Sequence, residues 1–190
     1  MSAPAASRSG IAPSNAAANG RMSDGGRTMT IQIIRTPHPP EALLAQIGEL
    51  LGAEGAPGDV ATMARRLSLL PREDRILMAL EADRLLGFAH LRITRDLAAE
   101  EAAEVVAIVV RPDHRRRGIG RMLIAAAETW ARQSARARLL LRTDVVRTPA
   151  HAFYVALGYQ KAATSIDFVR DLGIERRADL PTAPPPAGAR

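Results

Sequence analysis

One segment of the sequence reads Val110-Arg-Pro-Asp-His-Arg-Arg-Arg-Gly-Ile-Gly-Arg-Met-Leu123. Before it, residues 104–110 are nearly all apolar, as in a central strand covered on both faces. After it, apolar side chains recur at helical spacing through residue 134. The first turn of such a helix has unpaired N–H donors and the positive end of the helix dipole, and Gly118 and Gly120 let a ligand approach the backbone. With three arginines as charged donors, the pattern predicts a phosphate site.

A plainer interpretation is that Gly118 and Gly120 form an ordinary tight connection with exposed charge, since short glycine motifs often match by chance. Two familiar phosphate loops do not fit. The Walker pattern needs Gly-Lys-Ser/Thr and no lysine lies here, and the dinucleotide fingerprint needs a third glycine where this chain has Leu123.

Patterns on either side predict the remaining elements. Strands are expected at residues 30–35, 75–81, 85–94, 104–110, 138–142 and 160–170, and helices at 40–51, 59–70, 118–134 and 148–157. Asp59 is positioned as an N-cap and Pro71 ends that helix. Helices interleaved with strands predict an α/β (α+β) domain with a mixed sheet.

Composition limits the architecture and the location. Residues 1–28 and the Pro/Ala-rich residues 173–190 cannot bury enough apolar surface and are predicted to be disordered, which leaves a domain over 29–172. Met22 and Met29 are alternative starts to Met1. No apolar run approaches the roughly 18 residues that cross a bilayer, and the first residues lack a secretory signal. A cytoplasmic protein without a membrane partner is expected.

Charge and cysteine content exclude several partners. The chain has no cysteine, so disulfides, thiolate nucleophiles and sulfur-ligated metal sites are excluded, and no metal is expected. Its net charge is +6, but apart from Lys161 every basic residue is an arginine, largely interleaved with acids as in Arg72-Glu73-Asp74-Arg75. Scattered charge favours a solvated surface over a nucleic-acid partner, and a local anionic ligand better explains the densest cluster.

Two motifs resemble those of the GNAT N-acetyltransferase family. Arg115-x-x-Gly118-x-Gly120 matches the family's Arg/Gln-x-x-Gly-x-Gly/Ala. The segment Arg147-Thr-Pro-Ala-His-Ala-Phe-Tyr-Val-Ala-Leu-Gly-Tyr159 matches Ala-x-x-Phe-Tyr-x-x-x-Gly-Tyr/Phe. Both occur in family order and at family separation. The resemblance covers roughly residues 30–172 and implies the GNAT fold, a mixed central sheet of about six to seven strands flanked by about four helices.

The resemblance also implies acetyl-CoA as the cosubstrate. In the family the first motif grips the pyrophosphate, and the central strand splays from its neighbour to accept the pantetheine arm. Many members have asparagine where Arg147 stands, but a subgroup acting on small amines shares Arg147, Ala150, His151, Phe153 and Tyr154, and His151 is taken as structural. The residues expected to bind the cosubstrate are Ile108, Val109, Val110, Arg115, Arg116, Arg117, Gly118, Ile119, Gly120, Arg121, Arg147 and Tyr154.

Acetyl transfer to an amine needs a base, a donor to the developing oxyanion and a proton for the departing thiolate. The resemblance assigns the oxyanion to a backbone amide at Val110 or the residue before it. It assigns the thiolate to Tyr154, whose phenol has a pKa near 10 and stays protonated at neutral pH. The plainer interpretation of Tyr154 is that it packs its helix against the sheet.

The base is left open by the sequence. Related sequences often carry acids inside the central strand, where this chain has Val106 and Ala107. Glu104, acting through a water, and His90 are the candidates. The alternatives are that Glu104 is a solvated strand end and that His90 is structural.

The expected function is transfer of an acetyl group from acetyl-CoA to a primary amine of a small molecule, by direct attack in a ternary complex. One alternative is a sensor or scaffold of the same fold that binds acyl-CoA, consistent with the missing strand acids. Another is acetylation of a protein N-terminus or lysine. A homodimer is compatible with this fold.

Overall fold

The computed structural model describes residues 18–24, 27–56, 58–143, 147–163, 168 and 170 of the 190-residue chain. These residues fall into two compact units that divide between Asp144 and Val145. The domain predicted over residues 29–172 spans both units.

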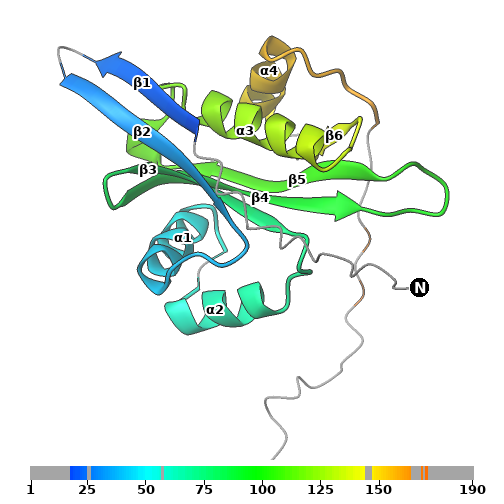
Figure 1. The fold of residues 1–190 in the computed structure, drawn as a ribbon, viewed down its shortest axis with the longest axis horizontal. Helices are drawn as coiled ribbons and strands as arrows, with labels where there is room; N and C mark the ends of the chain where they lie inside the picture. The colour runs from blue at the N-terminus through cyan, green and yellow to red at the C-terminus, as the bar shows by residue number, and fades with distance from the viewer. Residues whose placement is uncertain are drawn as a thin grey trace, which may run out of the picture. The chain divides into compact units, whose positions relative to one another are not determined.

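Six strands of the first unit form one sheet, in the order β1-β2-β3-β4-β5-β6 (Figure 1). The strands are β1 (Ala18–Asp24), β2 (Arg27–Thr36), β3 (Arg75–Glu81), β4 (Arg84–Thr94), β5 (Ala102–Val110) and β6 (Leu139–Leu141). Neighbours pair antiparallel except β5 and β6, which run parallel because a helix crosses over between them. The sheet is therefore mixed, and β5 is the strand at which the direction of pairing changes.

Helices cover both faces of this sheet. One face carries α1 (Glu41–Ala53) and α2 (Val60–Ser68), and the other carries α3 (Ile119–Gln133), as Figure 1 shows. A short 3-10 helix, η1 (Pro112–His114), follows β5, and the second unit contains α4 (Thr148–Ala156). Within the described parts of the chain, the mixed sheet and four α-helices confirm the predicted fold class. None of these helices is both long and apolar enough to span a bilayer.

The predicted signals around α2 are confirmed. The Asp59 carboxylate accepts a hydrogen bond from the Thr62 N–H at 2.7 Å, which satisfies a donor of the first turn and lowers the pKa of Asp59. After Pro71 the chain turns, and the Asp74 N–H donates to the Pro71 carbonyl at 3.0 Å. This turn places Asp74 directly before β3.

Two apolar layers hold the sheet between its helices. The layer toward α1 and α2 consists of Leu44, Ile47, Leu50, Met63, Ile76, Met78, Leu80, Leu85, Phe88 and Val109. On the other face, α3 buries the stripe that its spacing predicts, Ile119, Leu123, Ala127 and Trp130. Both α1 and α3 contact β5, so the expectation of a central strand covered on both faces is confirmed.

The expectation of disorder through residue 28 is wrong in part. Strand β1 pairs with β2 from Ala18↔Ile33 to Asp24↔Arg27. A ladder of backbone hydrogen bonds can form without apolar alternation, which the β1 sequence Ala-Asn-Gly-Arg-Met-Ser-Asp lacks. The sequence Gly25-Gly26 between the strands is a two-residue hairpin signal that composition alone overlooks.

The strand expected over residues 160–170 is absent from its described beginning. Residues 160–163 have no regular secondary structure, and most of the remainder lies outside the described residues. The C-terminal segment 173–190 also lies outside them.

Candidate active site

Two residues in the connection between β5 and α3 have a left-handed backbone conformation. Arg116 has a φ of 64°, and Gly118, the N-cap residue of α3, has a φ of 79°. Glycine adopts this conformation without steric cost, whereas it is uncommon for a residue with a Cβ. The turn at Gly118 therefore brings the chain into α3 directly after the arginines.

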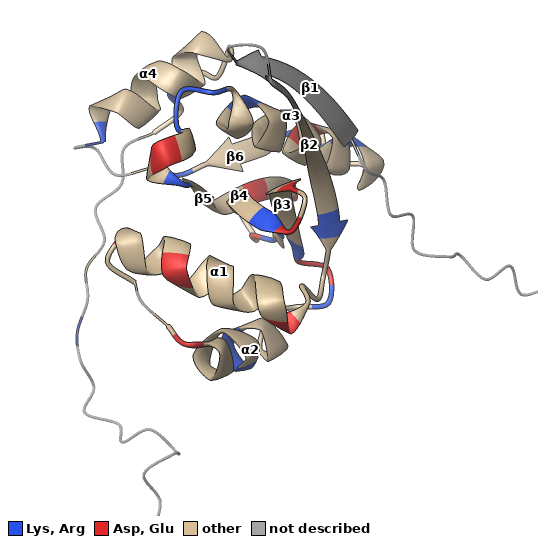
Figure 2. Cartoon of the chain, turned by 90° about the vertical axis from the view of Figure 1, so that its left-hand side faces the viewer, with Lys and Arg blue, Asp and Glu red and all other residues tan. Residues whose placement is uncertain are grey.

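The N-terminus of α3 offers unpaired backbone donors. The first N–H that bonds within the helix is that of Met122, which donates to the Gly118 carbonyl at 3.0 Å. The N–H groups of residues 119–121 precede it and have no acceptor within the helix. The first turn has no acidic residue, and the arginine run leads into it (Figure 2). This end of α3 has the geometry and charge that suit a phosphate group.

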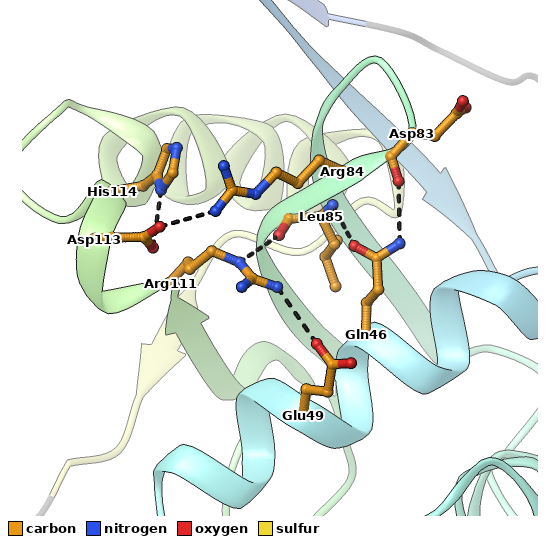
Figure 3. A network of polar contacts seen from close by, with 8 residues as sticks. All are labelled: Gln46, Glu49, Asp83, Arg84, Leu85, Arg111, Asp113 and His114. Atoms are coloured by element: carbon orange, nitrogen blue, oxygen red, sulfur yellow. Dashed lines mark hydrogen bonds and ion pairs between the residues drawn. The ribbon is translucent and has the colours of Figure 1, made fainter.

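Asp113 of η1 pairs with Arg84 at the start of β4 and with the neighbouring His114 of η1 (Figure 3). Arg84 Nη2 lies 2.8 Å from Asp113 Oδ2, and His114 Nδ1 lies 2.9 Å from Asp113 Oδ1. The hydrogen bond with His114, aided by the charges of His114 and Arg84, lowers the pKa of the Asp113 carboxyl. Sequence reasoning missed η1, although Pro112 at its first position is a usual signal.

Helix α1 is tied to the same region by polar side chains. Gln46 accepts from the Leu85 N–H at 2.8 Å and donates to the Asp83 carbonyl at 3.0 Å (Figure 3). Arg111 donates to the Leu85 carbonyl at 3.2 Å and lies 3.6 Å from Glu49. These contacts join α1 to the β3–β4 turn and to the residue that follows β5.

The arginines predicted to bind the cosubstrate differ in their surroundings. Arg115 bonds to Glu54 at the end of α1 at 2.7 Å and to the Val110 carbonyl at 3.2 Å. Arg116, Arg117 and Arg121 are exposed. Arg115 thus links the loop to α1, and the other three arginines face solvent around the start of α3.

The strands β5 and β6 separate halfway along β5. Their ladder has three pairs and ends at Val105↔Leu141, while β5 continues to Val110. The second half of β5 still pairs with β4, through Gly87↔Val110 at its end. Among the described residues, this half therefore has no partner strand on the β6 side. Ile108, Val109 and Val110, predicted to contact the cosubstrate, all lie there.

A β-bulge lies at the point where the strands separate. His90 pairs with Ala107 and Leu91 pairs with Val105, so Val106 is left without a partner on β4. A bulge of this kind shifts the alternation of side chains along the strand. Phe88↔Val109 and His90↔Ala107 on one side of the bulge therefore share a face with Arg92↔Glu104 on the other. Because Phe88 and Val109 belong to the layer against α1, that face is the one toward α1 and α2.

Glu104 is buried on this face and held by two arginines. It is 1% exposed, with Oε2 at 2.7 Å from Arg92 Nε and Oε1 at 3.1 Å from Arg142 Nε. The interpretation of Glu104 as a solvated strand end is therefore wrong. Arg142 follows β6 and contacts Glu104 on β5. The two residues are far apart in the sequence, so local sequence patterns do not predict this contact.

A second polar pair joins His90 of β4 to Asp74, which precedes β3. His90 Nε2 is 2.8 Å from Asp74 Oδ2, and Asp74 is 6% exposed. Sequence reasoning missed Asp74, because the run Arg72-Glu73-Asp74-Arg75 has the appearance of solvated charge. The one sequence feature that points to Asp74 is its partner, the single histidine His90 on the alternating strand β4. Among the described residues, His, Asp and Glu side chains form no cluster that could hold a metal ion.

In the second unit, α4 carries the second motif. Tyr154 packs against Phe153, with ring centres 5.3 Å apart, and edge-on against Tyr159 at 6.2 Å. Burial raises the pKa of Tyr154, and the charge of Arg147 opposes this shift only in part. The phenol therefore remains protonated at neutral pH. The Arg147 carbonyl accepts from the N–H groups of Ala150 and His151, which starts the helix.

Replacing Gly87 with alanine is expected to disturb the end of β5. A Cβ on Gly87 would lie 2.7 Å from the Val109 carbonyl oxygen and 3.2 Å from Val110 Cα. Both are backbone atoms that cannot rotate away, so β5 must shift, at a cost of about 1–3 kcal/mol. Thermal unfolding should show the lower stability, and titration with CoA should show weaker binding. Native-like binding would mean that the end of β5 does not contact CoA.

Comparisons with known proteins agree with this geometry. A model of the acetyltransferase (GNAT) family matches residues 44–159, more than half of the chain. Mycothiol acetyltransferase of Mycolicibacterium vanbaalenii is 35% identical over 116 residues, a match that covers 61% of this chain and 34% of that protein. Aminoglycoside N(6')-acetyltransferase type 1 of Stenotrophomonas maltophilia is 28% identical over 106 residues, covering 53% of this chain and 69% of that protein.

The fold is also that of a solved acetyltransferase. The aminoglycoside N-acetyltransferase AAC(6')-Iy in complex with CoA superimposes with a TM-score of 0.65 at 18% identity, covering 76% of this chain and 97% of that one. This chain spans about a third of the length of the mycothiol acetyltransferase that it matches. The family model spans both sequence motifs, 115–120 and 147–159. The chain therefore belongs to the GNAT acetyltransferase family.

Proposed function

We propose that this protein transfers an acetyl group from acetyl-CoA to a primary amine of a small molecule, by direct attack in a ternary complex. The observation that carries the proposal is the second half of β5, which among the described residues has no partner strand on its β6 side. It leads through the arginine loop to the open N-terminus of α3. An unpaired strand edge suits the amide groups of a pantetheine arm. A helix N-terminus amid arginines suits a pyrophosphate.

The chain's own groups divide the binding task. Backbone N–H groups at residues 119–121 would bind the pyrophosphate, with Arg116, Arg117 and Arg121 as charged donors. Backbone groups of Ile108, Val109 and Val110 would pair with the pantetheine arm. In this proposal a backbone amide at Val109 or Val110 stabilises the developing oxyanion.

The chemistry requires two proton transfers besides this stabilisation. The ammonium form of the acceptor must lose a proton to a base, and the departing thiolate must gain one. Tyr154 of the second unit is the proposed donor to sulfur, a role that its protonated phenol supports. For the base, the face of the sheet toward α1 and α2 offers Glu104, directly or through a water, and His90.

The names of the relatives support a small-molecule acceptor. By name, one matched protein is a mycothiol acetyltransferase and the other is an aminoglycoside N(6')-acetyltransferase. A sensor or scaffold that binds acyl-CoA is the second candidate, because Val106 and Ala107 carry no proton-accepting group. The phenol of Tyr154, which stays protonated because burial raises its pKa, favours an enzyme over a sensor, since a pure binding module has no use for a proton donor there. Acetylation of a protein N-terminus or lysine would use the same groups.

The test measures release of CoA thiol from acetyl-CoA with a panel of small primary amines, peptides and no acceptor. We expect acetyl-CoA to raise the melting temperature and at least one small amine to release thiol above the rate without acceptor. A rise in melting temperature with no turnover on any amine would establish the sensor instead. Turnover only on peptides would contradict the small-molecule acceptor.

A further inference from the structure

The polar pair Asp74–His90 lies where the strand acids of related sequences are missing. We propose that His90 is the general base of the transfer and that Asp74 is its positioning residue, leaving Nδ1 of the imidazole to take the proton. This inference rests on the proposed acetyltransferase function and assigns the base that the function leaves open.

Strand pairing places the imidazole beside the empty acid position. His90 on β4 lies directly opposite Ala107 on β5. Cross-strand partners have Cβ atoms about 4.5–5.5 Å apart, and the methyl group of Ala107 fills little of the space between them. The Val106 bulge adjoins this pair, and Ile108, Val109 and Val110 follow it. His90 therefore lies next to the strand segment proposed to hold the thioester end of the cosubstrate.

The contact with Asp74 selects one tautomer of the imidazole. Oδ2 of Asp74 is 2.8 Å from Nε2 of His90. A carboxylate can only accept, so Nε2 must carry the hydrogen and Nδ1 keeps its lone pair. The same carboxylate stabilises the imidazolium that forms when Nδ1 takes a proton. In this arrangement His90 is the base, and Asp74 is the group that fixes its orientation.

Asp74 is itself fixed in place. Its N–H donates to the Pro71 carbonyl at 3.0 Å, and its own carbonyl accepts from Arg75 Nη1 at 2.7 Å. It is buried, whereas the His90 side chain keeps 17% of its exposure. A buried acid behind a partly accessible imidazole leaves the imidazole as the group that can meet a substrate.

Glu104 is less suited to the same role. Both of its oxygens are bonded to guanidinium groups, those of Arg92 and Arg142, and the side chain is almost fully buried. Its contacts instead tie the residue after β6 to β5 next to the point where the strands separate. The charged groups that contact His90 or Glu104 in these pairs are Asp74, Arg92 and Arg142.

The proposed step balances as follows. Nδ1 of His90 takes one proton from the ammonium group of the acceptor and later releases it to solvent. The nitrogen lone pair forms the N–C bond while the C=O π electrons move to oxygen. When that pair returns, the C–S bond breaks and its electrons stay on sulfur. Sulfur takes the proton of the Tyr154 phenol, and the phenolate regains a proton from the nitrogen of the new amide.

The test compares His90→Gln, His90→Ala and Asp74→Asn with the wild type, and uses exposed His38→Gln as the matched control. We expect His90→Gln to lower kcat about 100-fold and to leave the affinity for acetyl-CoA unchanged. This effect is near the lower end of the range for general base catalysis, because some of the amine is already deprotonated in solution. Added imidazole should restore part of the activity of His90→Ala. Asp74→Asn should lower kcat and move the acidic limb of the kcat/KM profile to lower pH, because the imidazolium loses its carboxylate. His38→Gln should match the wild type.

The outcomes separate the two proposals. Wild-type protein that releases no thiol with any amine contradicts the proposed function. If the wild type is active and His90→Gln keeps full activity and a native melting temperature, the assignment of the base is overturned and the proposed function is not. A pH profile that moves with Glu104→Gln but not with Asp74→Asn would also overturn that assignment. If His90→Gln melts early, imidazole rescue of His90→Ala decides, since a purely structural histidine would give no rescue.

Discussion

Replacing Gly120 with aspartate is expected to abolish the binding of acetyl-CoA. Gly120 is the second residue of α3, next to backbone donors that are unpaired within the helix. An aspartate there would place a negative charge where the pyrophosphate is proposed to lie, and its carboxylate could accept from the same N–H groups. Like charges at such a distance cost several kcal/mol, so affinity should fall by at least about 100-fold. Calorimetric titration with CoA measures the loss.

The fold should survive this change, because acidic residues are favourable in the first turn of a helix. Ala125→Asp is the matched control, since Ala125 is exposed on the same helix but beyond its first turn. It should bind CoA like the wild type. If Gly120→Asp melts like the wild type and binds CoA equally well, the pyrophosphate is not bound at the start of α3.

The segment from β5 to α3 could be predicted because local signals coincide there. A strand that is apolar on both faces changes to a helical stripe, and two glycines mark the change. The left-handed φ of Gly118 and the buried positions of Ile119 and Leu123 follow the same signals. Such features depend on neighbours in the sequence, and sequence reasoning is at its strongest there.

The face of β5 around the bulge could not be predicted. Val106 is neither a glycine nor otherwise marked as a bulge, so counting alternate residues along β5 goes out of phase there. The positions that carry acids in related strands correspond to Val106 and Ala107, and the polar groups that occupy this region come from other segments. Asp74 comes from the turn before β3, and Arg142 follows β6. Contacts of this kind depend on the register of the whole sheet.

At the N-terminus, composition predicts disorder where the structure has a strand. A segment poor in apolar residues is expected to be disordered, yet β1 extends the sheet by pairing with β2. Its stabilisation comes from backbone groups, which composition does not record. Hairpin signals such as Gly25-Gly26 carry more weight for an edge strand than hydrophobicity does.

Replacing Tyr154 with phenylalanine is expected to lower kcat by about 10²- to 10⁴-fold, the range of general acid catalysis, with little change in the affinity for acetyl-CoA. Phenylalanine keeps the ring and its contacts with Phe153 and Tyr159, so the packing of α4 is retained. Only the proton for the departing thiolate is lost. Steady-state thiol release with a saturating amine, together with titration of CoA, separates the two effects.

The pH profile offers a second measure of the same phenol. Burial raises the pKa of Tyr154, so its active protonated form persists to higher pH than that of a free tyrosine. Wild-type kcat should therefore show no decline from loss of this proton below pH about 10. Tyr159→Phe is the matched control, because it removes the neighbouring phenol and should leave kcat near the wild-type value. Equal activity of Tyr154→Phe and Tyr159→Phe would contradict the role of Tyr154, and sulfur would then take its proton from water.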